Sequence, residues 1–401
     1  MMTVPSETEI LIVGAGPTGL TLTAELGRRG IDAVTVDKAA EGANTSRAAV
    51  VHARTLEVLE PLGIVPQMLE EGVKVPIFRI RDRDKVLITV DFREIPSKYA
   101  FALMCPQNRT EAILLSRLQA FGGNILRSAE VTGADITANG AHVEVKANDS
   151  IHEISARWVI GCDGMHSKIR EAAGIAFKGA TYKEGFVLAD VHMDWPLDRE
   201  EVSLFFSPDG LVVVAPLPQN RYRIVATAED APEQPSIPYV QALLDARGPK
   251  ANPARILDSF WSGHFKVHHR VAQNPRKGRV LLCGDAAHVH SPAGGQGMNT
   301  GIQDAVALAE VLADVLSGSD AARLDTWAVD RHKIAERVVA LTDRATKMAT
   351  LRSSVGQGLR NVAISLAGHI PSFTQNLGRT IAELENRAED KKQGYDGRIA
   401  L

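Results

Sequence analysis

Short apolar runs alternate with helix-spaced apolar positions at the start of the chain. Residues 9–13 form an apolar run, and the sequence GAGPTG follows at residues 14–19. Apolar positions continue at helical spacing over residues 20–26, and a second apolar run at residues 33–36 ends at Asp37. This order predicts a strand, a glycine turn, a helix and a second strand. An acid at the end of the second strand is typical of a dinucleotide-binding unit, where it binds ribose hydroxyls.

Each glycine of the GxGxxG spacing has a physical task in such a unit. Gly14 allows a tight turn, Gly16 lets the backbone approach a pyrophosphate, and Gly19 permits close packing of the helix. The spacing alone is a weak signal, and a plain glycine-rich turn in another α/β protein is the alternative. Its place between a strand and a helix, with an acid about twenty residues later, favours the dinucleotide site.

Two later apolar runs also end in an acid and a glycine. The apolar residues 280–283 lead into GD, and the apolar residues 158–161 lead into CDG. After the GD pair, a glycine-rich loop precedes a helical pattern that opens near Asn299. Free N–H groups at the start of that helix suit an anionic atom of a ring system or a phosphate. The three junctions together predict one extended nucleotide ligand that is contacted at several points.

The middle of the chain has a different pattern. Residues 177–271 alternate between apolar and polar positions, with one helical stretch at residues 237–246, and residues 73–104 alternate in the same way. Both segments predict strands of a mostly antiparallel sheet. After residue 304, helical spacing continues to about residue 349, ahead of a polar tail. The predicted fold class is therefore α/β, with a Rossmann-like nucleotide-binding domain, an inserted antiparallel-sheet domain and a helical C-terminal region.

One face of the second sheet is a candidate substrate surface. Alternation predicts that Leu204 and Phe206 share a face with Val212, Val214 and Pro216. An apolar face of this kind, at a junction between domains, suits an aromatic ring. Core packing against the helix of the same domain is the alternative for each of these side chains.

The composition of the chain excludes further classes of function. The 401 residues are 45% hydrophobic and 23% charged, with a formal net charge of −3, which indicates a large core and no basic footprint for nucleic acid or an anionic membrane. Cys105, Cys162 and Cys283 lie far apart without a CxxC pair, which favours reduced thiols over a disulfide framework. The N-terminus has no signal-peptide pattern, and no apolar run is long enough to span a bilayer. We therefore expect a cytoplasmic protein without stable membrane insertion, in which residues 359–366 are the one weak candidate for an amphipathic anchor.

The three motifs resemble, in order, those of the class A flavoprotein monooxygenases. This is the family of para-hydroxybenzoate hydroxylase, and its phenol hydroxylase-like aromatic hydroxylases are the most similar branch. GAGPTG resembles the FAD fingerprint, CDG with Ser167 and Arg170 resembles the DG motif, and GDAAH through GGQGMN resembles the GD motif. The resemblance covers nearly the whole chain and implies one FAD.

The resemblance also implies a division of the chain. A discontinuous FAD-binding domain is expected at residues 1–72, 105–175 and 276–325, and a substrate-binding domain at residues 73–104 and 176–275. Residues 326–401 are expected to form the helical C-terminal region with its polar tail. Many phenol hydroxylase-like members carry a further thioredoxin-like domain, which we do not expect here. The chain is expected to be a monomer or a homodimer.

The resemblance implies roles for particular residues in binding FAD. Arg47 and Gln107 are implied as flavin contacts, Val131 as a backbone neighbour of the adenine end, and Met298 with Asn299 as backbone donors to the flavin pyrimidine edge. The full set expected to bind FAD is Gly14, Ala15, Gly16, Pro17, Thr18, Gly19, Asp37, Lys38, Arg47, Gln107, Val131, Asp163, Gly284, Asp285, Gly295, Gly297, Met298 and Asn299.

The implied reaction is hydroxylation of a phenolic or polycyclic aromatic small molecule. NADPH or NADH reduces FAD, O2 reacts at the flavin C4a, and the resulting hydroperoxide transfers oxygen to an electron-rich ring from which water is excluded. Pro292 is implied as a catalytic backbone contact on the substrate side of the flavin, and Phe206, Val214 and Pro216 are the candidate substrate contacts. No side-chain base stands out.

Other readings of the same residues remain open. Asp285, His288 and His290, with His268 and His269, could be taken for a metal cluster, but no known ligand spacing is present, so we expect no metal. The tryptophan signature of flavin halogenases is absent from the sequence. A quinone-ring hydroxylase, a reductase and a catalytically idle FAD-binding module are the remaining alternatives.

Overall fold

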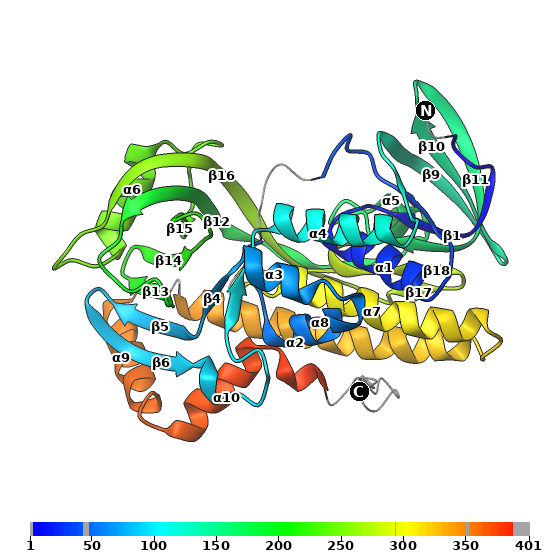
Figure 1. The fold of residues 1–401 in the computed structure, drawn as a ribbon. Helices are drawn as coiled ribbons and strands as arrows, with labels where there is room; N and C mark the ends of the chain where they lie inside the picture. Colours follow the sequence, from blue (N-terminus) through cyan, green and yellow to red (C-terminus); the bar gives the residue numbers. More distant parts are fainter. Residues whose placement is uncertain (1–2, 43–47, 293, 350, 352, 388–401) are drawn as a thin grey trace.

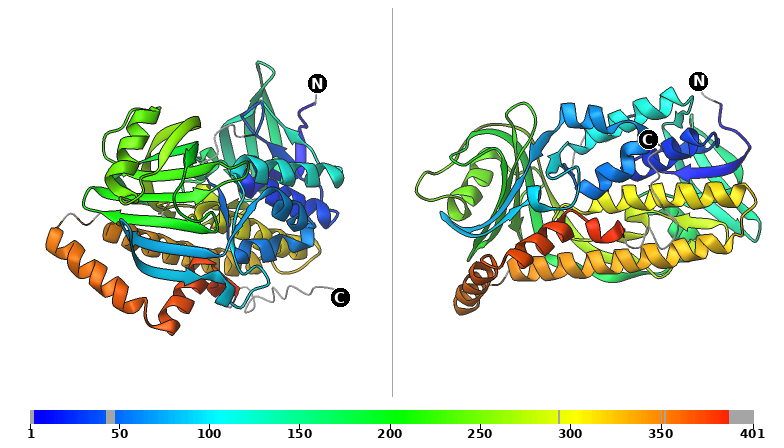
Figure 2. Two further views of the ribbon diagram at one scale, coloured as in Figure 1. Left: turned by 60° about the vertical axis from the view of Figure 1, so that its left-hand side comes forward. Right: turned by 60° about the horizontal axis from the view of Figure 1, so that its bottom comes forward.

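The computed structural model describes residues 3–42, 48–292, 294–349, 351 and 353–387, which are built around two large sheets (Figure 1). The expected α/β class, with a Rossmann-like part, an antiparallel sheet and a helical C-terminal region, is confirmed. The two sheets lie at opposite ends of an elongated molecule, and long helices run beneath both (Figure 2).

The first sheet carries the nucleotide-binding pattern. Its strands, in spatial order, are β17 (Arg276–Lys277), β18 (Val280–Leu282), β11 (Ser150–Gly161), β1 (Glu7–Val13), β2 (Val34–Val36) and β8 (Ile125–Leu126), and β10 (Gly140–Ala147) and β9 (Ala129–Thr137) extend it from β11. β1 pairs in parallel with both β2 and β11, and β11 pairs in parallel with β18. The carboxyl ends of these four strands therefore meet at one edge.

Helices cover one face of the first sheet. Ile10 and Ile12 of β1 pack in one apolar cluster with Leu22 of α1, Leu308 of α7 and Trp327 of α8. On the other face, apolar residues of β9, β10 and β11 form a second cluster with α5. The helices of the molecule are α1 (Pro17–Arg28), α2 (Ala53–Leu59), α3 (Val65–Glu71), α4 (Gln107–Ala120), α5 (Lys168–Ala172), α6 (Ile237–Arg247), α7 (Gly297–Leu316), α8 (Ala322–Ala349), α9 (Ser354–Ala367) and α10 (Pro371–Ile381). Short 3-10 turns are η1 (Glu60–Leu62), η2 (Phe92–Glu94), η3 (Gly284–Ala286) and η4 (Leu384–Asn386).

The second sheet is mostly antiparallel, as expected. Its order is β19 (His288–Val289), β16 (Arg255–Ala272), β12 (Phe177–Asp194), β15 (Tyr222–Ala228), β14 (Gly210–Pro216), β13 (Glu201–Ser207), β5 (Ile77–Asp82) and β6 (Lys85–Asp91). The hairpin of β5 and β6 joins through a parallel pairing of β5 with β13. β3 (Val50–Val51), β7 (Ala102–Met104) and β4 (Val73–Val75) form a small sheet of their own. The domain boundaries expected by residue number stay a prediction.

The prediction of which residues share the apolar face of β13 and β14 is wrong. Phe206 pairs with Leu211, and Leu204 pairs with Val213, so odd-numbered residues of β14 share a face with even-numbered residues of β13. Val214 lies on the opposite face, in the cluster that α6 covers with Val240 and Leu244. Pro216 follows Val214 at a spacing of two and therefore lies on that face as well.

The face that contains Phe206 is a separate apolar cluster. Phe206 packs there with Phe186, Leu211 and Val267, while Val213 and Phe265 are partly buried against them. Leu87 of β6 and Ile364 of α9 close this cluster from the side of the C-terminal helices.

Candidate functional site

The glycine turn after β1 packs directly on the CDG junction after β11. The N–H of Gly14 donates to the carbonyl of Val36 at 2.8 Å, and the N–H of Cys162 donates to the carbonyl of Val13 at 2.7 Å. Gly14 has a φ of +101°, and a Cβ there would collide with the carbonyl oxygen of Cys162. Only glycine suits this position, because the left-handed conformation and the close approach both exclude a side chain.

The GD motif meets the same helix from the other side. A Cβ on Gly284 would lie 2.5 Å from the hydroxyl oxygen of Thr18, and one on Gly301 of α7 would collide with that same hydroxyl. Arg170 of the DG motif donates from Nη1 to the carbonyl of Ala286 at 2.9 Å. The three motifs that are far apart in sequence therefore form one site around the start of α1, as expected from their strand-end positions.

The start of α1 is open toward an anion. Gly16 is the N-cap, no side chain caps the helix, and Pro17 occupies the first turn. No protein atom lies within 4 Å of where a Cβ on Gly16 would be. Unpaired N–H groups at a helix start carry a partial positive charge, so this space fits a pyrophosphate.

Asp37 lies at the end of β2 beside this opening. Its Oδ2 accepts the N–H of Ala15 at 2.6 Å and its Oδ1 accepts the N–H of Ala39 at 2.8 Å. Nη1 of Arg127 lies 3.6 Å from Oδ1 of Asp37. An ionised carboxylate has about four acceptor sites, so Asp37 keeps capacity for a ribose hydroxyl after these contacts.

Asp163 contributes a carboxylate that is only half satisfied. Its Oδ2 accepts the N–H groups of Lys168 and Ile169, at 2.7 and 3.3 Å. Its Oδ1 is buried and has no hydrogen-bond partner in the described part of the chain. Burial raises the pKa of this carboxyl above its ordinary value, although hydrogen bonds from Ser167 and backbone N–H groups oppose the rise. A ligand hydroxyl or N–H would satisfy the remaining oxygen.

The loop before α7 is fixed to β3 by buried polar groups. The side-chain oxygen of Asn299 accepts the N–H of His52 at 2.8 Å, and its nitrogen donates to the carbonyls of Val50 and Gly295, both at 2.9 Å. Gly295 has a φ of +64°, and a Cβ there would collide with Val50. His52 pairs with the carbonyl of Gly294 at 2.8 Å. The side chain of Asn299 thus shapes the loop, and its backbone N–H lies at the start of α7, where donation to a flavin edge was expected.

Two histidines of this region are held neutral. Burial lowers the pKa of His52 to about 4, although its hydrogen bond to Gly294 opposes the fall. Burial likewise lowers the pKa of His290 to about 4, against an opposing hydrogen bond to the carbonyl of Ser291. Since Nδ1 of His290 faces that carbonyl at 3.0 Å, it carries the proton, and Nε2 is an acceptor. Sequence reasoning missed His52, because its partners lie more than 240 positions away in the chain.

Several other residues that were expected to contact FAD lie in different parts of the structure. Gln107 begins α4, accepts the N–H of Ala48 at 3.3 Å and donates to Glu111 at 2.9 Å. Val131 is buried in β9, next to a bulge in its pairing with β10. Lys38 and Asp285 are exposed. Arg47 lies outside the described residues.

The remaining expected contacts lie at the two helix starts. Ala15 and Gly19 are buried, while Pro17, Thr18, Gly297 and Met298 are partly exposed beside them. The carbonyl of Pro292 accepts the N–H of Gly295 at 2.9 Å, so one of its two lone pairs is already used.

His288, which follows the GD pair, lies in a buried polar cluster with Asp304 and Arg331. Nε2 of His288 pairs with Oδ2 of Asp304 at 2.6 Å, and Nε of Arg331 pairs with Oδ1 at 2.5 Å. Burial alone would raise the pKa of Asp304, but the charges of Arg331 and His288 outweigh it and lower the pKa. Within the described ranges, no group of three or more potential ligands is placed to hold a metal ion.

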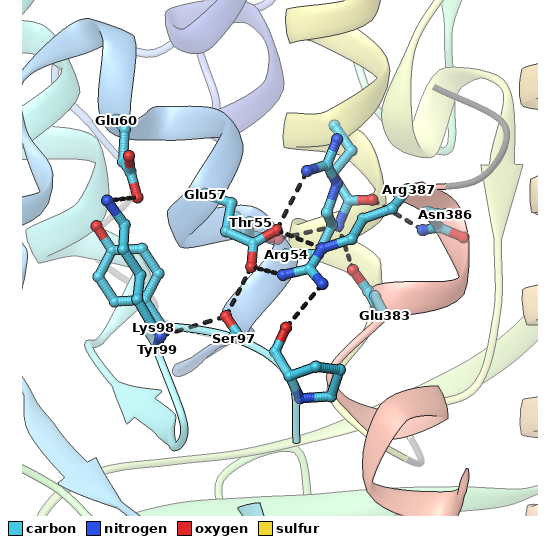
Figure 3. A network of polar contacts seen from close by, with 12 residues as sticks. Arg54, Thr55, Glu57, Glu60, Ser97, Lys98, Tyr99, Glu383, Asn386 and Arg387 are labelled. Carbon is cyan, nitrogen blue, oxygen red and sulfur yellow. Dashed lines mark hydrogen bonds and ion pairs between the residues drawn. The ribbon is translucent and has the colours of Figure 1, made fainter. Parts of the chain in front are cut away.

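Arg54 takes part in a polar network with Glu57. It pairs with Glu57 at 3.2 Å, and Glu57 also accepts from Ser97 at 2.6 Å and from Arg387 at 2.9 Å (Figure 3). Burial would raise the pKa of Glu57, but the hydrogen bonds from Arg387 and Ser97 lower it. The network ties α2 to the segment that follows α10.

The residues present at the site fit a FAD molecule: an uncapped helix start with open space, a strand-end acid, a second acid whose buried Oδ1 has no hydrogen-bond partner among the described residues, and a second helix start at α7. Residues 7–342 match the model of a protein family described as "FAD binding domain". The chain belongs to this FAD-binding family.

Two of the relatives that the chain matches are monooxygenases by name, and they confirm the resemblance to class A aromatic hydroxylases. The chain is 36% identical over 363 residues to 6-methylpretetramide 4-monooxygenase of Streptomyces rimosus, covering 89% of this chain and 65% of that protein. It is 32% identical over 341 residues to pentachlorophenol 4-monooxygenase of Sphingobium chlorophenolicum, covering 83% of this chain and 63% of that one. The chain thus spans slightly less than two thirds of the length of these two relatives.

A solved structure supports the same assignment. The anhydrotetracycline hydroxylase of Streptomyces rimosus superimposes with a TM-score of 0.80 at 31% identity, over 94% of this chain and 76% of that chain. In the described part of this protein, no helix combines the length and the apolar character that crossing a membrane requires.

Proposed function

We propose that this protein is a FAD-dependent monooxygenase that hydroxylates an aromatic small molecule, phenolic or polycyclic, with NADPH or NADH and O2 as co-substrates. The observation that carries the proposal is the meeting of three strand-end motifs around the open start of α1, in a chain of the FAD-binding family. The monooxygenase names of its relatives support the reaction class.

Different residues of the site would bind different parts of FAD. The N–H groups after Gly16 would bind the pyrophosphate, and Asp37 would bind a ribose. Asp285 at η3 and Asp163 lie at the neighbouring strand ends and would hold the central part of the molecule. Backbone N–H groups of Met298 and Asn299 would donate to the pyrimidine edge of the flavin, where the dipole of α7 favours negative charge.

When bound, FAD would supply the chemistry that accepts a hydride and activates oxygen. The protein would then have to position an aromatic ring and keep water away from it. We place the substrate beside the apolar cluster of Phe206, Leu211 and Val213, facing the loop that carries Pro292. Val214 and Pro216 are not part of this proposal, because they lie on the face that α6 covers.

Proton handling would rely on acceptors of this loop. The carbonyl of Pro292 has a second lone pair for a substrate hydroxyl, and Nε2 of His290 is a neutral acceptor with no hydrogen-bond partner within the described ranges. A histidine with a pKa of about 4 is a weak base, so it would accept a hydrogen bond from the substrate rather than remove its proton.

Stoichiometry and kinetics test the proposal. The purified protein should be yellow, contain one non-covalent FAD, and oxidise a nicotinamide cofactor in air faster when a suitable phenol is present, with formation of hydroxylated product. A colourless protein that cannot be reconstituted with FAD would contradict cofactor binding. Retained FAD without bleaching by either nicotinamide, across a screen of aromatic ligands, would instead identify a catalytically idle FAD-binding module.

A further inference from the structure

Two of the three cysteines lie side by side at the carboxyl ends of neighbouring strands. β11 and β18 pair in parallel with Gly161 opposite Leu282, and the N–H of Cys283 donates to the carbonyl of Gly161 at 3.0 Å. Cys283 keeps an extended backbone, with a φ of −129° and a ψ of 149°, so the pairing continues for one more residue on each strand. Cys162, which follows Gly161, is therefore opposite Cys283.

The two side chains lie on the same face of the first sheet. Cys283 belongs to the apolar cluster that includes residues of α1, α7 and α8, and Cys162 packs against that cluster. The thiol of Cys283 is hydrogen-bonded to Cys162. Neighbouring strands lie about 4.8 Å apart, and the Cα atoms of a disulfide are separated by about 4.4 to 6.8 Å. The two sulfur atoms can therefore form a covalent bond with little movement of the backbone.

The two thiols differ in their access to solvent. Cys162 is partly exposed, whereas Cys283 is fully buried. Burial, and after it the contact with Cys162, raises the pKa of the Cys283 thiol above its ordinary value. Because oxidants react with accessible thiolates, Cys162 is the first of the two to react, and Cys283 is placed to attack it afterwards. Cys105 is buried in a different apolar cluster and serves as a matched control.

The cysteine pair packs against the start of α1 without spare room. A Cβ on Gly14 would lie 2.3 Å from the carbonyl oxygen of Cys162, and one on Gly19 would lie 3.4 Å from the Cβ of Cys162. On the other strand, Cys283 precedes Gly284, which is in equally close contact with the first turn of α1. A movement that draws the two strand ends together therefore changes the contacts of the turn and the helix start, where we place the pyrophosphate.

We propose that Cys162 and Cys283 form an oxidation site, at which hydrogen peroxide converts the two thiols into a disulfide that links the DG and GD motifs and weakens the binding of FAD. The sulfur of Cys162 attacks one oxygen of the peroxide, the O–O bond breaks, and a sulfenic acid and one water result. The sulfur of Cys283 then attacks the sulfenic sulfur, the S–O bond breaks, and the proton of Cys283 leaves with the hydroxyl as a second water. The two thiols thus lose two electrons, and the peroxide gains them.

Thiol counting on the full chain with its FAD tests the disulfide. After treatment with hydrogen peroxide and denaturation in an alkylating reagent, the wild type should keep one reactive thiol of its three, and dithiothreitol should restore the other two. Mass spectrometry of the digested protein should find Cys162 linked to Cys283. Cys105→Ala should form the same link, whereas Cys162→Ala should keep both of its thiols. Three thiols that persist after peroxide, or a Cys162 that becomes a sulfinic acid without a link to Cys283, would overturn the proposal.

FAD titration tests the effect on the cofactor, which rests on the proposed function, whereas formation of the disulfide does not. The oxidised wild type should bind FAD at least about tenfold more weakly than the reduced form, with recovery in dithiothreitol. Cys162→Ala should bind FAD equally before and after peroxide, which excludes general damage by the oxidant. A disulfide that forms with unchanged FAD affinity would refute the effect on the cofactor site. A protein that binds no FAD in either redox state would instead contradict the proposed function, and its thiol count would still decide whether the disulfide forms.

Discussion

Val213 and Val214 are neighbours in sequence, yet they pack in different clusters. Val214 is 1% exposed beneath α6, whereas Val213 is partly buried beside Phe206. We expect Val214→Trp to lose about 1 to 3 kcal/mol of stability through overpacking. Val213→Trp should keep its melting temperature and FAD but remove the acceleration of nicotinamide oxidation by substrate. If the two variants behave alike in both assays, the substrate does not lie on the Phe206 face.

Asp285 is an exposed acid whose proposed role is at the cofactor. We expect Asp285→Ala to weaken FAD binding by about 1.5 to 3 kcal/mol, the value of a hydrogen bond to a charged group. Asp32→Ala, an exposed carboxylate after α1, is the control and should leave the FAD titration unchanged. Fluorescence titration of the apoprotein measures both, and an unaltered affinity in Asp285→Ala would remove this residue from the site.

The glycine positions could be predicted from sequence, whereas the side-chain faces could not. Gly14 and Gly284 are required by backbone approach, a constraint that is visible in the motif itself. The face of Val214 depends on the pairing of Ser207 with Gly210, which leaves a two-residue turn and sets odd residues opposite even ones. The positions of His52 and Asn299 depend on contacts between distant segments, and no local pattern encodes those.

At the scale of elements, one buried acid couples α7 to the C-terminal segment. Glu383 precedes η4, lies in the network of Figure 3, and accepts a hydrogen bond from Gln303 of α7. Gln303 also donates to Thr55 at 3.1 Å and accepts from Asn386 at 2.8 Å. Burial raises the pKa of Glu383 to about 8, although Gln303 and the charge of Arg331 oppose the rise and Asp304 adds to it.

This pKa predicts a pH-dependent stability. A folded-state pKa above the ordinary 4.5 means that the stabilisation is fully present below pH 4.5 and is lost as pH rises through about 8. In that window the wild type should lose up to about 1.4 kcal/mol per pH unit relative to Glu383→Gln, which mimics the protonated acid. Glu385→Gln, an exposed neighbour, is the control. Melting temperatures between about pH 5 and about pH 9 measure the difference, and parallel curves for wild type and Glu383→Gln would show that Glu383 is ionised throughout.

At the scale of the whole molecule, α7 and α8 lie side by side beneath both sheets (Figure 2). Asp304 of α7 bonds Arg331 of α8 and His288 of β19, so one buried carboxylate joins two helices to the second sheet. The hydroxyl of Thr346 near the end of α8 donates to Ser291 at 2.8 Å, which brings the same helix to the loop of the proposed site. The long helix therefore links α7 and the second sheet to the loop that follows β19.

Two ion pairs between these helices allow a matched comparison. Arg331 pairs with buried Asp304, whereas Arg323 pairs with Asp314 where both side chains are 41% exposed. Arg331→Met leaves a buried carboxylate without its main counter-charge and should cost about 3 to 5 kcal/mol. Arg323→Met should cost at most about 1 kcal/mol, because solvent screens the exposed pair. Urea unfolding followed by tryptophan and flavin fluorescence gives both values; similar small losses would mean that Asp304 is neutralised by other means and that the α7–α8 contact does not depend on its charge.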